Sequence, residues 1–589
     1  MMTKSLSRAK ATPKQPAEKV SDHAQTGAPG PYARDAFERW VLFADVLRER
    51  ADNMIAHERQ GMPPLLDFDY EKVLDARNFE RPANYALLGI TRIGEDCWDD
   101  CVDMAKPPVI VIDPRAGHGP GIGGFKRDSE VGMAMHEGHP VYFVIFYPEP
   151  MPNQTLADVH YALRDFVKEV ARRHPNTAPV LYGNCQAGWA ATLLAADCEG
   201  LTGPIVLNGS PLSYWSGEAA SSPMRMMGAL TGGAWAAHMI SDLGDGRFDG
   251  AWLAQNFESL QPEKAIWDKY ANLFAHADTE RVRFLEFERW WNGYYTLSRA
   301  EILGITQNLF IGNRLEQGEM QLGAHCTVDL KRIANPIIIF ASEGDNITPP
   351  EQALGWIAKL YPNTNALRAA GQRIVYMTHA HVGHLGIFVS GSVARLQHRA
   401  ILESLDEVDA LAPGLYEMVI DNPSGDPDCK AGDYSLRFLA REVDDLRIAT
   451  DDAALQQVAR VSRINEAAYA SFVSPWLQAA TTPASAAALR ALHPMRWTRT
   501  MFSAQVNPWM ALVQSSAAAI RKTRTPLPDD DPAILAERAL FARTGKVLGN
   551  WRKGRDAWVS LVFGAAFATP FDIFTTTQAD PSDAASSKE

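Results

Sequence analysis

The chain has 589 residues, 46% hydrophobic and 22% charged, which is typical of a large globular protein with a substantial core. Its net charge of -13 and pI near 5.7 argue against nucleic acid as a partner, because no basic face is indicated. The N-terminus lacks the apolar core of a signal peptide, and no run of about 18 apolar residues is present. Secretion and a transmembrane segment are therefore not expected.

The cysteines, at positions 97, 101, 185, 198, 326 and 429, do not show the paired spacing of a metal site. All but Cys185 are interpreted as structural thiols, and no metal or cofactor is predicted. So few cysteines in so long a chain are typical of a protein of the reducing cytoplasm.

The N-terminal part divides into two predicted regions. Residues 1–33 are rich in Lys, Ala, Pro, Ser and Gly, a composition that predicts a disordered tail, with contact to a polymer granule or membrane as the alternative. Residues 34–100 form a predicted N-terminal helical region, because apolar residues recur at helical spacing from Arg34 to Gln60.

Apolar runs separated by helical segments predict a mainly parallel α/β sheet in two stretches, 101–210 and 328–405. Residues 211–327 interrupt this alternation with a Met-, Trp- and Ala-rich stretch that predicts a helical cap. Residues 406–589 form a predicted C-terminal helical region with no recognisable chemistry. The predicted strands are 107–113, 141–146, 180–182, 204–208, 336–342 and 373–377.

The first of these strands leads into a glycine-rich loop, 114–125. A phosphate cradle is disfavoured, because the loop has neither a P-loop lysine nor dinucleotide-binding spacing. We expect instead that the backbone of Gly117 contributes to an oxyanion hole together with Gln186, with a purely structural loop as the alternative.

The strand at 180–182 ends in Gly183-Asn-Cys-Gln-Ala-Gly188, and an alanine-rich helical segment follows. Small residues at 183, 187 and 188 suit a sharp strand-to-helix turn that presents Cys185 at its tip as a nucleophile. The alternative is a cysteine that only packs in the core. Asp345, on the loop after strand 336–342, is the candidate acid.

Three histidines, at 379, 381 and 384, follow strand 373–377. We predict His384 as the base, because glycine precedes it and an apolar helical segment follows, whereas a metal site formed by the three lacks further ligands nearby. Within the cap, Trp290, Trp291 and Tyr294 are candidates for lining an acyl tunnel, with core packing as the alternative.

These motifs resemble the polyhydroxyalkanoate synthases, and most closely a bacterial family of uncharacterised synthase-like proteins known as DUF3141. The similarity spans residues 100 to 395 and includes the box around Cys185, the approach to Asp345 and the Gly383-His384 pair. Ala187 replaces a glycine of the synthase box, and Asn346 stands where the synthases usually have histidine.

The resemblance implies an α/β-hydrolase fold and a Cys185-Asp345-His384 triad that transfers acyl groups from 3-hydroxyacyl-CoA through an acyl-S-enzyme. A thioesterase or depolymerase-like hydrolase is one alternative, and a non-catalytic polymer-granule-associated protein is another. The resemblance implies hydroxyacyl-CoA or polyester as the substrate. It also implies a protein of the cytoplasm, with a polymer granule surface as a possible partner, and leaves homo-oligomerisation open.

Overall fold

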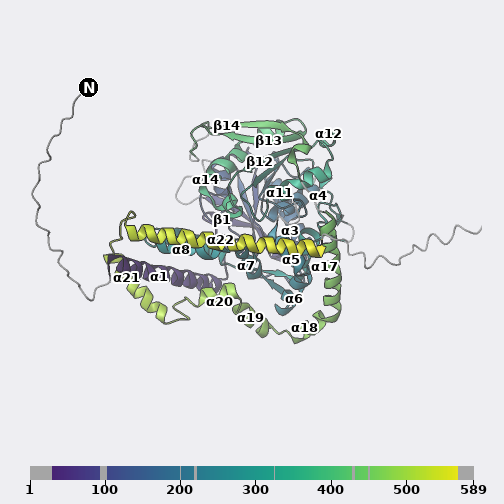
Figure 1. The fold of residues 1–589 in the computed structure, drawn as a ribbon. Coiled ribbons are helices and arrows are strands. Elements are labelled where there is room, and N and C mark those ends of the chain that lie inside the picture. The colour runs from purple at the N-terminus through teal and green to yellow at the C-terminus, as the bar shows by residue number, and fades with distance from the viewer. Residues whose placement is uncertain are drawn as a thin grey trace, which may run out of the picture.

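The computed structural model describes residues 30–92, 102–198, 200–217, 222–323, 326–426, 432–448 and 452–567. Residues 1–29 of the predicted disordered tail 1–33, and Cys97, Cys101 and Cys429, lie outside the described residues. The end of that tail is predicted wrongly, because the first helix of the chain already begins at Pro31. A ten-stranded sheet is the centre of the fold (Figure 1), and its strands lie in the order β1-β2-β4-β3-β5-β6-β11-β12-β13-β14. The strands are β1 (Asp69–Asp75), β2 (Tyr85–Arg92), β3 (Val109–Ile112), β4 (Val141–Phe146), β5 (Val180–Asn184), β6 (Ile205–Asn208), β11 (Ile337–Ser342), β12 (Arg373–His379), β13 (Gly414–Asp421) and β14 (Ser435–Arg441).

In the order in which the strands lie in the sheet, each neighbouring pair from β4 to β13 is parallel, as predicted. The pairs β1/β2, β2/β4 and β13/β14 at the two edges are antiparallel. This strand order, with helical crossovers and a sharp strand-to-helix turn after β5, is that of an α/β-hydrolase fold. Its central strands are buried on both faces, which explains their continuous apolar sequences.

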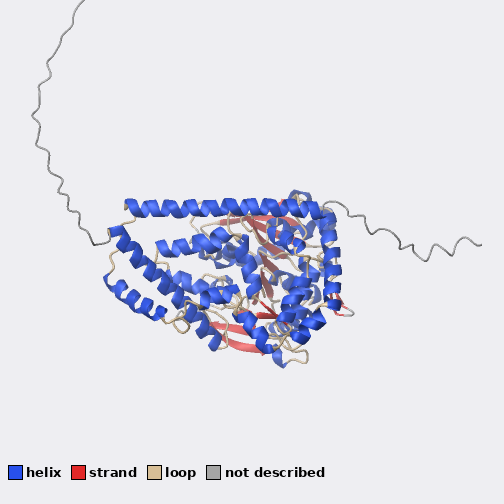
Figure 2. Ribbon diagram, turned by 60° about the horizontal axis from the view of Figure 1, so that its bottom comes forward, coloured by secondary structure: helices blue, strands red, loops and turns tan. Residues whose placement is uncertain are grey.

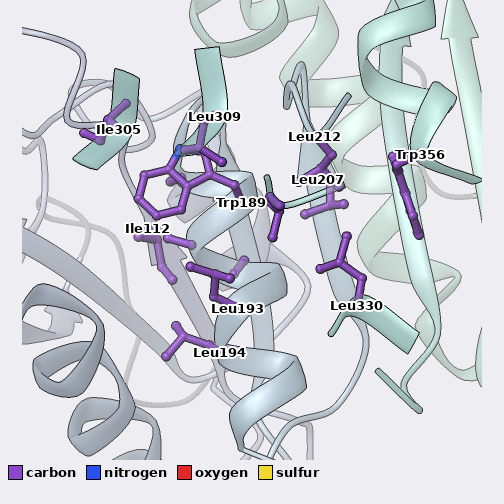
Figure 3. Packing of buried hydrophobic residues seen from close by; sticks show 14 of the residues in the cluster. Ile112, Trp189, Leu193, Leu194, Leu207, Leu212, Ile305, Leu309, Leu330 and Trp356 are labelled. Carbon is purple, nitrogen blue, oxygen red and sulfur yellow. The ribbon is translucent and has the colours of Figure 1, made fainter. Parts of the chain in front are cut away.

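Alternate residues of each central strand contribute to the two apolar layers. In β11, Ile337 and Ile339 face one layer, and Ile338 and Phe340 face the other. The first layer also contains α3, α4 and α11, and Figure 3 shows Trp189, Leu193 and Leu207 packing within it. The helices that cover the sheet are α2 (Glu130–His136), α3 (Leu156–Arg173), α4 (Ala187–Asp197), α11 (Pro350–Leu360), α12 (Thr364–Ala369), α13 (His384–Val389), α14 (Gly391–Val393), α15 (Arg399–Glu403) and α16 (Leu405–Ala410).

The predicted cap contains helices together with two short strand pairs, β7 with β8 and β9 with β10. It follows β6 and returns the chain to β11. Its elements are α5 (Pro223–Leu230), α6 (Trp235–Leu243), β7 (Arg247–Asp249), α7 (Ala251–Leu260), the π-helical segment η3 (Glu263–Asp268), α8 (Lys269–Ala275), α9 (Arg281–Trp291), β8 (Thr296–Ser298), α10 (Arg299–Ile305), β9 (Gln321–Gly323) and β10 (Cys326–Thr327).

The two flanking regions differ from the prediction. Helix α1 (Pro31–Arg59) is present, but β1 and β2 lie within the predicted helical region 34–100, and β13 and β14 lie within the predicted helical region 406–589. Strands β1 and β14 are edge strands with exposed or half-buried side chains, so they lack the continuous apolar sequence of the central strands. The hydrolase core is therefore wider at both edges than predicted.

The remaining C-terminal chain is helical and covers the cap and α1. Figures 1 and 2 show α22 as one long rod on the outside of the molecule. The helices are α17 (Asp452–Phe472), α18 (Ser474–Ala480), α19 (Pro483–Ala491), α20 (Pro494–Thr500), α21 (Trp509–Thr523) and α22 (Pro532–Phe567). Among the described residues, none of these or the earlier helices is long and apolar enough to span a bilayer.

Candidate active site

Cys185 lies at the tip of the turn between β5 and α4, with a φ angle of 50°. This left-handed conformation is strained for a residue with a side chain, and it is the conformation expected of a nucleophile elbow. A Cβ atom on Gly183 would lie 2.8 Å from the Cα atom of Gly188, and one on Gly188 would lie 2.1 Å from Oγ of Ser210. Both glycines are therefore required by close packing. Ala187 is the first residue of α4, in helical backbone, so a Cβ atom is accommodated there.

The structure brings Cys185, His384 and Asp345 together at the carboxyl ends of three parallel strands. The Nε2 atom of His384 lies 3.2 Å from Sγ of Cys185, and its Nδ1 atom lies 2.7 Å from Oδ2 of Asp345. The other carboxylate oxygen of Asp345 accepts hydrogen bonds from the amides of Ile347 and Thr348, both at 2.8 Å. The carboxylate is thus fixed from one side and can orient the imidazole from the other.

All three side chains are buried, with 6% of Cys185, 3% of Asp345 and 6% of His384 exposed. Burial works to lower the pKa of His384, but Asp345 and then Cys185 outweigh it and raise this pKa to about 10. A proton on His384 is thus stabilised between a carboxylate and the sulfur. This arrangement can take the proton of the Cys185 thiol and hold it on the imidazole.

The two neighbouring histidines have other positions. The Nδ1 atom of His379 accepts from the amides of His381 and Val382, at 3.1 and 3.2 Å, and so stabilises the turn before α13. His381 is exposed. Of the three candidates, His384 is the one hydrogen-bonded to both Cys185 and Asp345. Among the described residues, no group of three or more His, Cys, Asp or Glu side chains is arranged to hold a metal ion.

The two predicted oxyanion-hole residues lie in different surroundings. Gln186 follows Cys185 directly, is buried, and precedes the first residue of α4. Gly117 has a φ of 101°, and a Cβ atom there would lie 2.4 Å from the carbonyl oxygen of Gly250 in the cap. The Gly117 carbonyl accepts from the amide of Tyr295 at 3.0 Å. Gly117 therefore joins the glycine-rich loop to the cap, and its role in an oxyanion hole stays a prediction.

The aromatic residues predicted to line a tunnel are buried around a single histidine. The ring centroid of His118 lies 4.9 Å from that of Trp290, 4.4 Å from that of Trp291 and 6.1 Å from that of Tyr294. The indole of Trp290 donates to the Gly119 carbonyl at 3.1 Å, which fastens the glycine-rich loop to α9. Trp290 and Trp291 share one apolar cluster with Cys185, and contact with substrate stays a prediction.

A buried polar network beneath the elbow was not predicted from the sequence. Asp113 accepts hydrogen bonds from the amides of Gly121 and Gly123, at 2.6 and 3.1 Å, and so folds the glycine-rich loop back over β3. Burial raises the pKa of Asp113 to about 6, against the opposing effect of these amides. Its Oδ1 atom lies 3.5 Å from the side-chain nitrogen Nδ2 of Asn184, the residue before Cys185. The sequence held one signal for this network, because Asp113 is a polar residue directly after a buried strand.

Tyr214 is a second residue that sequence reasoning missed. Its hydroxyl is buried without a hydrogen-bond partner in the described structure, and its ring packs edge-on against Phe310 at 4.5 Å. Burial, and next the charge of Cys185, raise the pKa of Tyr214 well above its ordinary value. The Tyr214 hydroxyl is thus held in its neutral form. Tyr214 follows β6, in a segment where no sequence motif indicates a functional residue.

Comparison with known proteins identifies the family. The family model for a protein of unknown function, DUF3141, matches residues 35–589. An uncharacterised protein in the ackA 5' region of Rhizobium meliloti is 44% identical over 533 residues, which cover 89% of this chain and 72% of that protein.

More distant similarity connects the chain to polymerases. A poly(3-hydroxyalkanoate) polymerase subunit PhaC of Synechocystis is 24% identical over 42% of this chain and 62% of its own length. The PhaC subunit of Haloferax mediterranei is 22% identical over 44% of this chain and 51% of its own length. The chain thus spans less than two thirds of these two relatives.

Solved structures with a similar fold include an esterase of Pyrobaculum calidifontis, with 11% identity, a TM-score of 0.32, and coverage of 62% of this chain and 94% of the esterase. The family model matches nearly the whole chain, and a relative of 44% identity covers most of it. The chain belongs to the DUF3141 family.

Proposed function

We propose that this protein is a cysteine-dependent acyltransferase of the polyhydroxyalkanoate synthase type, which acts on 3-hydroxyacyl-CoA through an acyl-S-enzyme. The observation that carries the proposal is the hydrogen-bonded series from Cys185 through His384 to Asp345 on a nucleophile elbow. The distant similarity to two PhaC subunits supports the polymerase type over other acyl-transfer reactions.

In the first half-reaction, His384 takes the proton of the Cys185 thiol, and the thiolate attacks the thioester carbonyl of the acyl-CoA. The oxyanion that forms is stabilised by the backbone amide of Gln186 and by an amide of the glycine-rich loop. When the tetrahedral intermediate collapses, the bond to the CoA sulfur breaks and the CoA thiolate takes the proton from His384. An acyl thioester on Cys185 and free CoA result.

In the second half-reaction, the hydroxyl of another hydroxyacyl group gives its proton to His384 and attacks the acyl thioester. The bond between the acyl carbon and the Cys185 sulfur breaks, the new ester bond extends the polymer, and the Cys185 thiolate takes the proton back from His384. If water attacks instead, the product is a free hydroxy acid, and the same residues make the protein a hydrolase. Asp345 stabilises the imidazolium in both halves.

The experiment is to measure CoA release from 3-hydroxybutyryl-CoA by the purified protein, with identification of the acyl product. Cys185→Ala is the test variant. Cys198→Ala is the matched control, because Cys198 is also a buried free cysteine, and burial raises its pKa to about 11. We expect release that is lost in Cys185→Ala and retained in Cys198→Ala.

The product then separates the two reactions, since polymer indicates a synthase and free acid indicates a hydrolase. Absence of CoA release with several hydroxyacyl chain lengths, from protein that unfolds at its normal temperature, would refute the proposal.

A further inference from the structure

Helix α22 (Pro532–Phe567) has one face on the protein and one face in solvent. Its inner face contacts α5, α17 and the π-helical segment Glu263–Asp268, and it buries Ile534, Val559 and Phe563. Figure 1 shows the helix crossing in front of the molecule, and Figure 2 shows it along the upper boundary, with no described element covering its other side. With 36 residues, α22 presents an outer face roughly 50 Å long at about 1.5 Å per residue.

Large apolar side chains form a stripe on this outer face. Leu540, Val547, Trp551 and Trp558 are exposed to 60, 59, 59 and 64%. Their spacing of seven, four and seven residues places all four on one side of the helix, because each residue advances the helix by about 100°. Exposed apolar residues aligned over several turns are typical of a binding surface rather than of scattered surface residues.

Exposed basic side chains occupy the other part of the solvent-facing side of α22. At about 100° per residue, Arg543 lies about 60° around the helix from the stripe, and Lys546 and Lys553 lie about 120–140° from it. Arg543, Lys546 and Lys553 are exposed, and from residue 538 to 567 the sequence has six basic residues and one acidic residue. That acidic residue, Asp556, is paired with Arg552 and Arg555 on the side towards the protein. The outer face of α22 is therefore locally positive on a chain whose net charge is -13.

We propose that the outer face of α22 docks on the surface of a membrane that contains anionic lipids. Tryptophan is well suited to the boundary between headgroups and acyl chains, and Arg and Lys attract the lipid phosphates. The helix lies in the plane of the surface, since its opposite face is buried on the cap. A second copy of the chain is a poorer occupant, because its α22 offers no exposed carboxylate to the basic residues.

This inference is independent of the proposed acyl transfer, because it concerns a different face and is tested by binding alone. The full chain is sedimented with vesicles of phosphatidylcholine, and with vesicles of phosphatidylcholine mixed with phosphatidylglycerol. We expect binding to the anionic vesicles that exceeds binding to the neutral ones by about tenfold or more, and that weakens with added salt.

Two double variants test the two parts of the face. Trp551→Ser with Trp558→Ser, and Lys546→Glu with Lys553→Glu, should each weaken binding to anionic vesicles by about tenfold or more. All four residues are exposed, so the unfolding temperature should not change. Trp476→Ser, at a residue 79% exposed on α18, and Lys168→Glu with Arg172→Glu on α3 are the matched controls and should bind normally.

The proposal is overturned if anionic vesicles do not bind the protein, or if the α22 variants bind as well as the controls. It is also overturned if the α22 variants instead convert a dimer to a monomer in sedimentation velocity, because the face would then be occupied by a second copy.

Discussion

The side-chain amide of Asn208 donates a hydrogen bond of 3.0 Å to Oδ1 of Asn184, and so joins the ends of β6 and β5 directly beneath the elbow. The backbone carbonyl of Asn208 also accepts from the amide of Cys185 at 2.8 Å. One residue of β6 therefore fixes both the strand end and the strained residue that follows it. The position of the sulfur depends on this neighbouring strand.

We predict that Asn208→Ala lowers the free energy of unfolding by about 1–3 kcal/mol, because it leaves the buried acceptor of Asn184 without its partner. It should also lower kcat for CoA release, since the elbow loses a support. Urea unfolding and steady-state kinetics measure the two effects. Asn176→Ala, at an exposed asparagine of the turn between α3 and β5, should stay within about 0.5 kcal/mol of the wild type.

A second prediction compares two glycines. Gly188→Ala should destabilise the protein by about 1–3 kcal/mol or prevent folding, because its Cβ atom would lie 2.1 Å from Oγ of Ser210. Gly228→Ala, in α5 with no atom within 4 Å of the new Cβ atom, should instead stabilise it by up to about 1 kcal/mol. Thermal unfolding measures both, and equal effects would contradict the packing at the elbow.

The raised pKa of His384 predicts a pH dependence of stability. The folded protein binds this proton more tightly than the unfolded chain, whose histidine pKa is about 6.5. The stabilisation is thus complete below about pH 6.5 and is lost as the pH rises towards 10. The difference in unfolding free energy between wild type and His384→Gln should therefore shrink between pH 6 and pH 10. His381→Gln, at an exposed histidine of the same loop, is the control variant and should unfold within about 0.5 kcal/mol of the wild type.

A fourth prediction concerns the buried ion pair between α1 and α22. Glu537 accepts hydrogen bonds from both terminal nitrogens of Arg39, at 2.5 and 2.9 Å, and from the Tyr32 hydroxyl at 2.8 Å. Glu537→Ala should reduce the unfolding free energy by about 3–5 kcal/mol, because it leaves a buried guanidinium short of a partner. Arg39→Met combined with Glu537→Leu should recover most of this loss.

The control for that measurement is Arg34→Ala, which breaks the exposed pair with Glu38 and should change the unfolding free energy by less than about 1 kcal/mol. A small effect of Glu537→Ala would show that α22 is held to α1 by other contacts.

The central strands and the turn that carries Cys185 were predictable because their signals are local. β3 and β11 are buried on both faces, so each is a continuous apolar sequence, and Cys185 stands in a short pattern of small residues. The edge strands β1 and β14 were missed because exposed positions introduce polar residues that obscure the strand pattern. Pro31–Arg59 was predicted as a helix because its apolar positions recur at helical spacing.

The supporting residues of the site could not be predicted in this way. Asn208 and Tyr214 act on the surroundings of Cys185 only because β6 lies beside β5 and the chain then turns over the elbow. His118 likewise meets Trp290 only after the cap has folded onto the glycine-rich loop. Such contacts depend on tertiary packing between distant segments, for which a single sequence carries no periodic or spacing signal.

The pairing of α1 with α22 also has a consequence for synthesis on the ribosome. Arg39 and Glu537 are 498 positions apart, so at about 5–20 residues per second α1 waits roughly 25 to 100 s for its partner to be translated. Val41 and Leu42, which pack against α21, wait nearly as long. Val46 and Leu47, in contrast, pack against Leu273 and Phe284 of the cap, which are made in the first half of translation. A nascent chain therefore carries α1 only partly covered until α21 and α22 are made, and a chain that terminates before α22 never completes the pair.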